Sequence, residues 1–214
     1  MKFVIFGSTG PSGLQLVDEC LQQGHHVTAL VRNPEKMTVT HEHLTVTKVD
    51  LAKEDELVPH VTGNDAVLSC LGGQAGIWVP CSVYTDSIKT IIGAMRKCGV
   101  SRFVGMSSWG TKHDPGLPWI IRWVLRPLFL RNVLPNMAEM EDYLSNNCTD
   151  IDYTVVRPPG LTNDEASGKE VLTFQGQYVP ETSSRIPRRD VVKFMLRCAI
   201  NGEWKNTHVA VGIK

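Results

Sequence analysis

Three glycines near the start of the chain have a spacing that suits phosphate binding. Gly7, Gly10 and Gly13 follow an apolar run at residues 3–6, and apolar residues at helical spacing begin at Leu14. In a strand–loop–helix unit, such glycines permit a sharp turn, a close approach of ligand to backbone, and close packing of helix on strand. Backbone N–H groups and the helix dipole then face the anion. The predicted contacts are Gly7, Ser8, Thr9, Gly10, Ser12 and Gly13.

The context of this loop favours a dinucleotide over a purely structural turn. The spacing is GxxGxxG rather than GxGxxG, so the glycines alone leave both interpretations open. The loop directly follows a predicted strand, which is where a dinucleotide loop must lie. Pro11 falls in the first helical turn, where its missing N–H costs nothing.

The end of the second predicted strand, His26–Val31, carries the next chemical signal. About 20 residues after the glycine loop, an NAD-binding protein has an acid that binds the ribose 2′-hydroxyl. This chain has Arg32 there, and Lys36 is near enough in sequence to add positive charge. Because arginine forms charge-assisted hydrogen bonds with phosphate, the sequence predicts NADP(H) rather than NAD(H). The alternative is that Arg32 is an ordinary surface charge and Glu35 binds the ribose.

Residues that follow four later strands complete the predicted site, because ligands bind at the carboxyl ends of parallel strands. Asp50 suits either a hydrogen bond from the adenine amino group or the cap of a turn. Gly72 either leaves room for the nicotinamide ribose or belongs to an ordinary loop. Ser107 and Ser108 are either catalytic polar groups or a strand-end cap. The full set is Asp50, Leu51, Leu71, Gly72, Ser107, Ser108, Pro158 and Pro159.

The elements that must position these residues alternate between strand and helix. Strands are expected at residues 3–6, 26–31, 44–49, 66–71, 102–106, 153–156 and 208–211, with a small β element at 171–174. Helices are expected at about 14–23, 54–58, 82–98, 138–145 and 190–200, with Ser82 as a cap. Nearly continuous apolar strands between helices are typical of a parallel sheet covered on both faces. We therefore expect an α/β fold with a Rossmann-type doubly wound, mostly parallel sheet, in one NAD(P)-binding domain over residues 1–214.

Composition excludes several other classes of protein. Lysine plus arginine equals aspartate plus glutamate, with 22 of each, so no global charge indicates nucleic-acid binding. The six cysteines are scattered without a CxxC pair, which indicates reduced core thiols in a cytosolic protein. The seven histidines show no convincing set of metal ligands. No signal-peptide pattern precedes the first strand, so a cytoplasmic location is expected.

A largely apolar insert at residues 109–136 follows the fifth strand. Its segment 117–134 carries arginines between its tryptophans and leucines, and it is too short and too charged to cross a bilayer. Pro127 predicts two short helices rather than one long helix. Three interpretations remain: a lid over the ligand site, an interfacial helix that binds a membrane or partner, and a core helix. The lid is favoured because the segment leaves the ligand side of the sheet.

Segments over almost the whole chain resemble the atypical, NmrA-like branch of the short-chain dehydrogenase superfamily. Within that branch, the chain is most similar to the flavin reductase (NADPH) family, also called the biliverdin-IXβ reductases. The glycine loop identifies only the superfamily, whereas the segment at 184–198 favours the flavin reductase (NADPH) family within it. The matching segments are residues 6–13, 27–32, 50–51, 65–67, 71–72, 107–108, 156–159 and 184–198.

This resemblance implies NADPH-dependent reduction of a flavin or a planar tetrapyrrole in a shallow pocket. Ser108 matches the active-site serine of the family, near the nicotinamide, and a monomer is expected. Gly160 stands where the family reductase has a histidine, and the loop at 73–76 lacks its basic residue. These departures, together with the insert at 109–136, leave the acceptor open among flavin, tetrapyrrole and quinone.

The chemistry of a planar acceptor requires little from the protein. Typical short-chain dehydrogenases use a Tyr-xxx-Lys pair, and no tyrosine here is followed by lysine at that spacing. Holding two rings in close contact supplies most of the catalysis, solvent can supply the proton, and Ser108 would orient the acceptor. The alternative is an NmrA-like redox sensor that binds NADP(H) and regulates a partner through the apolar insert.

Overall fold

The computed structural model describes residues 1–73, 80–119 and 121–214, and its centre is an eight-stranded sheet. The strand order is β3-β2-β1-β4-β5-β6-β10-β8, and only β8 runs antiparallel to its neighbour. The strands are β1 (Lys2–Phe6), β2 (His26–Val31), β3 (Leu44–Lys48), β4 (Ala66–Ser69), β5 (Arg102–Met106), β6 (Asp152–Arg157), β8 (Leu172–Phe174) and β10 (Thr207–Gly212). The strand order reverses between β1 and β4, where a doubly wound sheet binds its ligand. The predicted fold class is confirmed.

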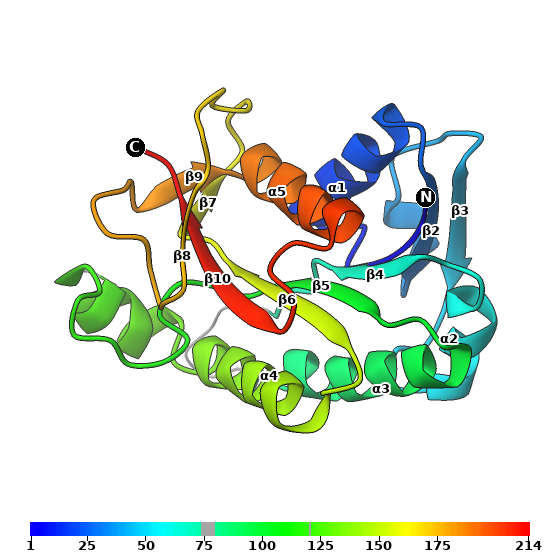
Figure 1. The fold of residues 1–214 in the computed structure, drawn as a ribbon, viewed down its shortest axis with the longest axis horizontal. Helices are drawn as coiled ribbons and strands as arrows, with labels where there is room; N and C mark the ends of the chain where they lie inside the picture. Colours follow the sequence, from blue (N-terminus) through cyan, green and yellow to red (C-terminus); the bar gives the residue numbers. More distant parts are fainter. Residues whose placement is uncertain (74–79, 120) are drawn as a thin grey trace.

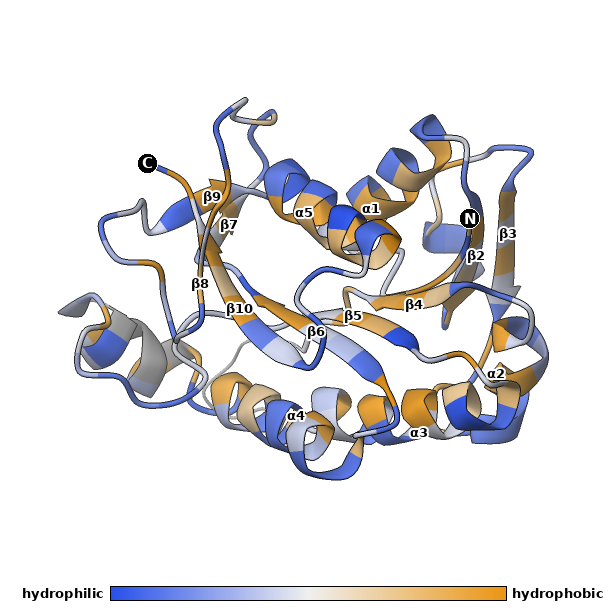
Figure 2. Cartoon of the chain, viewed as in Figure 1, coloured by the Kyte–Doolittle hydropathy of each residue, from blue (hydrophilic) through white to orange (hydrophobic). Residues whose placement is uncertain are grey.

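Helices cover both faces of this sheet (Figure 1). On one face, α1 (Pro11–Gln22) packs beside α5 (Arg188–Asn201). On the other face, α2 (Glu54–Val61), α3 (Val83–Cys98) and α4 (Val133–Asn147) lie in a row. The apolar sides of α3 and α4 face the strands, and their polar sides face outward (Figure 2).

Successive side chains of β1 pack into two different hydrophobic cores, one on each face of the sheet. Val4 and Phe6 belong to the core beneath α3 and α4, whereas Phe3 and Ile5 belong to the core beneath α1 and α5. All four side chains are fully buried. Since successive residues of a strand point to opposite faces, a strand buried on both sides must be apolar throughout. This is why the strands are easily found in the sequence.

A second, small sheet lies at the carboxyl end of β6 and was missed by the sequence analysis. It pairs β7 (Gly160–Thr162) with β9 (Arg185–Pro187) in parallel register, Leu161 opposite Ile186. Three-residue strands are too short to show periodicity, and their pairing joins segments far apart in the chain. The small sheet determines where α5 begins.

The expected cap of α3 by Ser82 is wrong. Ser82 precedes the helix, but its side chain makes no capping hydrogen bond. Instead, the backbone N–H of Tyr84 donates to Oδ1 of Asn136 on α4 at 3.0 Å. An oxygen from a neighbouring helix satisfies the free helix N–H as well as a local serine does, and sequence alone does not show such a neighbour.

The insert at 109–136 divides into buried ends and an exposed middle. Trp109 and Leu117 are buried in a cluster with Val179 and Ala210, and α4 begins at Val133. Trp119 and Trp123 are 70% and 66% exposed. Within the described residues, no helix is both long and apolar enough to cross a membrane.

The expected helix break at Pro127 is also wrong. Pro127 lies inside η2 (Ile121–Phe129), which is a π-helix, and the chain leaves helical geometry only between η2 and α4. Proline disrupts an α-helix because its ring meets the carbonyl four residues earlier. The wider turn of a π-helix, which bonds to the fifth residue, changes that spacing.

Candidate cofactor site

The loop between β1 and α1 has a backbone that requires two of its three glycines. Gly7 has a φ of +71°, a conformation that favours glycine, and a Cβ there would lie 2.5 Å from the carbonyl carbon of Cys70. A Cβ at Gly13 would lie 2.1 Å from the carbonyl oxygen of Gly7. At Gly10 the nearest atom would be 3.4 Å away, which is ordinary contact. The fold therefore requires glycine at positions 7 and 13. Glycine at position 10 is not required by the fold, so its lack of a side chain can instead allow a ligand to approach the backbone.

A cleft of about 440 Å³ opens beside this loop, at the reversal of strand order. It brings together nine of the residues predicted for the site, from β1, β2, β4 and β5 or the loops that follow them. They are Gly7, Thr9, Gly10, Ser12, Arg32, Lys36, Leu71, Gly72 and Ser107. Lys36 ends the short 3₁₀-helix η1 (Pro34–Lys36). The common location follows from parallel strands that all end at one edge.

Other predicted residues lie outside the lining of the cleft. Asp50 is exposed, and its Oδ1 accepts a hydrogen bond from the backbone N–H of Ala52 at 3.0 Å, so it caps a turn. Ser8 is fully buried, and among the described residues its hydroxyl has no hydrogen-bond partner. The residues in this group are Ser8, Gly13, Asp50, Leu51, Ser108, Pro158 and Pro159.

Ser107 and Ser108 are separated by the alternation of the strand. Ser107 lines the cleft, whereas Ser108 is half-buried and does not. The backbone N–H of Ser107 still donates to the carbonyl oxygen of Val156 at 2.8 Å, so β5 stays extended there. Successive side chains of an extended strand point to opposite sides, so the two serines have different surroundings. The sequence predicted both serines for the site, with Ser108 as the active-site serine that the resemblance implies.

A buried ion pair lies behind Ser107. Its Oγ donates to Oε1 of Glu141 on α4 at 2.7 Å. Glu141 is fully buried and receives two hydrogen bonds from Arg157, at 2.9 and 2.7 Å, and a third from Thr111 at 2.9 Å. Bidentate arginine–carboxylate pairs are strong and directional. Since a hydroxyl has one proton, Ser107 offers the cleft only its lone pairs while this bond is intact.

Several lining residues were missed by the prediction. Four of them come from segments far from the predicted residues, namely Tyr84, Met137, Leu161 and Arg188, whereas Pro11, Cys70 and Met106 adjoin predicted residues in the chain. The hydroxyl of Tyr84 accepts a hydrogen bond from the backbone N–H of Gly73 at 3.0 Å, which ties α3 to the chain just after β4. Burial raises the pKa of Tyr84, so this phenol is neutral. Burial also raises the pKa of the Cys70 thiol to about 12, which keeps it protonated.

The charge of the cleft suits a phosphorylated dinucleotide. Its described lining residues include three cations, Arg32, Lys36 and Arg188, and no carboxylate. The glycine loop forms a cradle that side chains at Gly7 or Gly13 would fill. The buried Ser8 hydroxyl lies in the same loop. Cations, a side-chain-free backbone and a helix N-terminus together are what a pyrophosphate requires.

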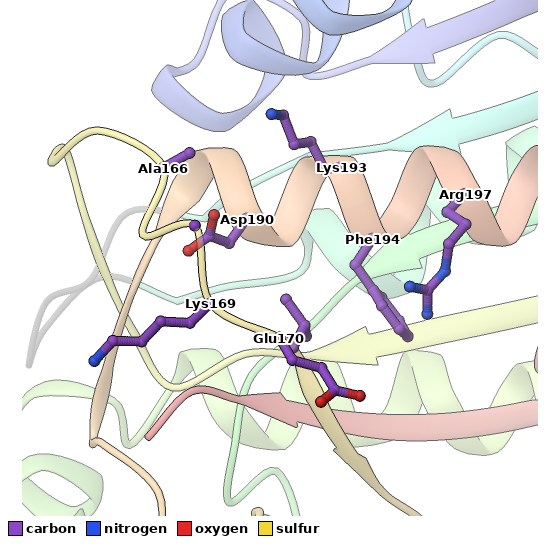
Figure 3. A pocket seen from close by; sticks show the side chains of 9 residues that line it. Ala166, Lys169, Glu170, Asp190, Lys193, Phe194 and Arg197 are labelled. Atoms are coloured by element: carbon purple, nitrogen blue, oxygen red, sulfur yellow. The ribbon is translucent and has the colours of Figure 1, made fainter.

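A second pocket, of about 350 Å³, lies where the loop at 163–171 packs on α5 and shares no lining residue with the cleft (Figure 3). Both carboxylate oxygens of Asp190 accept from the backbone N–H of Ser167, at 3.2 and 3.1 Å. The Arg197 guanidinium lies 4.9 Å from the ring centre of Phe194 and pairs with Glu203. The contact between Ser167 and Asp190 fastens the loop to α5, and Arg197 is held by its contacts with Phe194 and Glu203.

The fold, the glycine loop and the cationic cleft define a Rossmann-type dinucleotide-binding protein. The chain belongs to the NAD(P)H-binding family, which matches residues 7–201. This membership confirms the predicted class of cofactor and agrees with an oxidoreductase.

Two curated relatives match most of this chain, and a solved structure shares its fold. The chain is 29% identical over 183 residues to an uncharacterized chloroplastic protein of Arabidopsis thaliana, covering 80% of this chain and 63% of that protein. It is 24% identical over 229 residues to the photosystem II assembly factor Ycf39 of Synechocystis, covering 99% of this chain and 63% of that protein. ChuY, an anaerobilin reductase from Escherichia coli O157:H7, has the same fold, with a TM-score of 0.80, 18% identity and coverage of 100% and 97%. The chain thus spans less than two thirds of the length of these two curated relatives.

Proposed function

We propose that this protein is an NADPH-dependent reductase that transfers hydride to a flavin or to a similar planar acceptor. The observation that carries the proposal is one cleft that joins the glycine loop, two cations after β2 and Ser107 after β5. Along the sheet, the cations follow β2, the glycine loop follows β1 and Ser107 follows β5. A dinucleotide with its adenosine end near β2 and its nicotinamide end near β5 matches this order. The family resemblance and the fold shared with an anaerobilin reductase support a planar acceptor.

The choice of NADP(H) over NAD(H) rests on Arg32. It is exposed at the end of β2, and Lys36 lines the same part of the cleft. A guanidinium suits the 2′-phosphate of NADP(H). Bound cofactor would supply the hydride, and the chain's own residues bind it, position the acceptor and limit access of water.

Arg32→Ala is expected to weaken NADPH binding about 10- to 100-fold and to leave NADH binding within about twofold, because charge-assisted hydrogen bonds contribute about 1.5–3 kcal/mol each. Titration of both nucleotides against the same protein, followed by fluorescence, measures the difference. Glu35→Ala is the control, since it lowers NADH affinity only if Glu35 binds the ribose hydroxyls. Equal losses of affinity for NADPH and NADH in Arg32→Ala would show that this arginine does not bind the 2′-phosphate.

The two serines after β5 have separate proposed roles. Ser107 donates to Glu141, so toward the cleft it acts as a hydrogen-bond acceptor for a ligand N–H. Ser108 is the proposed orienting group for the acceptor, as the resemblance implies. Neither serine is proposed as a nucleophile, because the carboxylate beside Ser107 is already engaged by Arg157.

Anaerobic reduction of FMN by NADPH, followed by loss of flavin absorbance, tests the proposal. The unaltered protein is expected to show saturable turnover well above the uncatalysed rate. Ser108→Ala is expected to lower kcat at least about tenfold, with NADPH affinity within about twofold, as general positioning contributions of this size are common. Absence of turnover with FMN, biliverdin and a quinone, while NADPH binds tightly, would overturn the reductase assignment.

A second candidate, a nucleotide-binding sensor or assembly protein, is favoured by one observation. Trp119 and Trp123 are largely exposed, and Leu128 on η2 is 49% exposed. Exposed aromatic groups are typical of partner surfaces. Similarity to an assembly factor agrees with this role. In that case Ser108→Ala changes neither nucleotide affinity nor any slow turnover. The lid interpretation stays a prediction, since none of the described residues at 109–136 lines the cleft.

A further inference from the structure

One cation in the cleft comes from the distant C-terminal part of the chain. Arg188 is the first residue of α5, and it lines the cleft together with the glycine loop. Its Nη1 donates to Oγ of Ser12 at 3.1 Å, across 176 residues of sequence. Its Nε donates to Oδ1 of Asn163 at 2.8 Å. Both acceptors are neutral, so neither balances the charge of the guanidinium.

The neighbouring arginine provides a comparison within the same helix turn. Arg189 pairs with Asp18 at 2.8 Å and with Glu19 at 3.3 Å, both on α1. These ion pairs fasten α5 to α1. The ion pairs formed within residues 1–73, 80–119 and 121–214 include none for Arg188. One arginine therefore stabilises the packing of two helices, whereas the other is left facing the cleft.

The position of Arg188 is unfavourable for the helix itself. The N-terminus of a helix carries partial positive charge, so a cation in the first turn is repelled. Burial lowers the pKa of Arg188, since partial removal from water disfavours its charged form. Pro187 at the helix start offers no side-chain cap, and the acid of the first turn, Asp190, accepts hydrogen bonds from the backbone N–H of Ser167. A residue that destabilises its own helix is expected at a position where function requires that residue.

The small sheet holds Arg188 in this place. Thr162 of β7 lies opposite Pro187 of β9, so the strand register sets the first residue of α5. Asn163 follows β7 directly and holds the guanidinium by its Nε. The side chain is thus restrained from two sides before any ligand binds, which lowers the entropic cost of using it for recognition.

We propose that Arg188 binds the pyrophosphate of the dinucleotide together with the glycine loop, and that Ser12 and Asn163 are its positioning residues. Ser12 lies in the first turn of α1, where the N-terminal N–H groups can donate hydrogen bonds to an anion. Arg32 and Lys36 follow β2, where the 2′-phosphate belongs. Arg188 therefore binds the pyrophosphate of NADP(H), whereas Arg32 and Lys36 bind its 2′-phosphate. This inference rests on NAD(P)H binding by the cleft and does not depend on the acceptor.

The test compares binding of NADPH, NADH, ADP and adenosine 2′-monophosphate to R188Q, R188K and R189Q by calorimetry. R188Q is expected to weaken NADPH, NADH and ADP by a common factor of about 10 to 100. Adenosine 2′-monophosphate, which lacks a pyrophosphate, is expected to bind R188Q as tightly as it binds the unaltered protein. R188K is expected to recover part of the loss, because it keeps the charge but not the fork of donors.

Thermal unfolding without ligand separates binding from folding. R189Q is expected to unfold at a lower temperature and still bind NADPH with unaltered affinity, whereas R188Q keeps its unfolding temperature and loses affinity. Unaltered NADPH affinity in R188Q, or an equal loss for adenosine 2′-monophosphate, overturns the inference. If R188Q fails to fold, R188M takes its place in the same titrations, and unaltered NADPH affinity in R188M overturns the inference. If the unaltered protein binds no NADPH, the proposed function fails together with this inference.

Discussion

Glu141→Ala is expected to lower the free energy of unfolding by about 3–5 kcal/mol, because it leaves a buried arginine without its partner. Arg157 is 6% exposed and Glu141 fully buried, and two hydrogen bonds join them. The variant also removes the acceptor of Ser107 and Thr111. For a chain of this size, the loss corresponds to a fall in Tm of roughly 6–20 °C. Thermal and urea unfolding measure it.

Asp142 is the matched control for this prediction. It is the next residue on the same helix, half-exposed, and it pairs with the exposed Lys112. Exposed pairs contribute about 0–1 kcal/mol, so Asp142→Ala is expected to change stability by less than about 1 kcal/mol. Adding Arg157→Met to Glu141→Ala is expected to restore part of the stability, since it removes the unpaired charge. A loss in Glu141→Ala as small as that in Asp142→Ala would contradict the argument.

Gly13→Ala is expected to abolish NADPH binding and to destabilise the protein by at least about 1–3 kcal/mol, because the added methyl group has no space. Its Cβ would lie 2.1 Å from the carbonyl oxygen of Gly7 and 2.6 Å from the Cα of Ser8. Both neighbours are backbone atoms, so no side-chain rotation relieves the clash. The loop must shift, and the start of α1 with it.

Gly10→Ala is the companion variant, which is expected to lower NADPH affinity without lowering stability. Its Cβ meets its nearest neighbour at 3.4 Å, and its backbone is extended, with φ −81° and ψ 164°, which alanine adopts readily. Stability without ligand is therefore expected to stay within about 1 kcal/mol, whereas NADPH affinity falls because backbone and pyrophosphate must approach closely. Thermal unfolding and NADPH titration of both variants give four values. Tight binding by Gly13→Ala, or unfolding of Gly10→Ala, would reverse the assigned roles of the two glycines.

The fold was readable from the sequence because its signals are local. Strand β1 is buried on both faces, so it appears as an unbroken apolar run before Gly7. Parallel strands separated by helices imply a common edge at which loop residues meet. That single rule placed Arg32, Leu71 and Ser107 in one cleft, although they lie far apart in the chain. Where the signals were short, as in β7 and β9, the prediction failed.

The sequence by itself determined the α/β class, the glycine loop and the cations after β2, because periodicity and turn residues are encoded locally. Only the tertiary structure decided that Ser107 rather than Ser108 lines the cleft, that Asn136 caps α3, and that Arg188 reaches Ser12. These contacts depend on helix packing and strand register, which join residues through space with no fixed spacing along the chain. Packing thus brings a basic group to the phosphate loop that no motif in the sequence indicates.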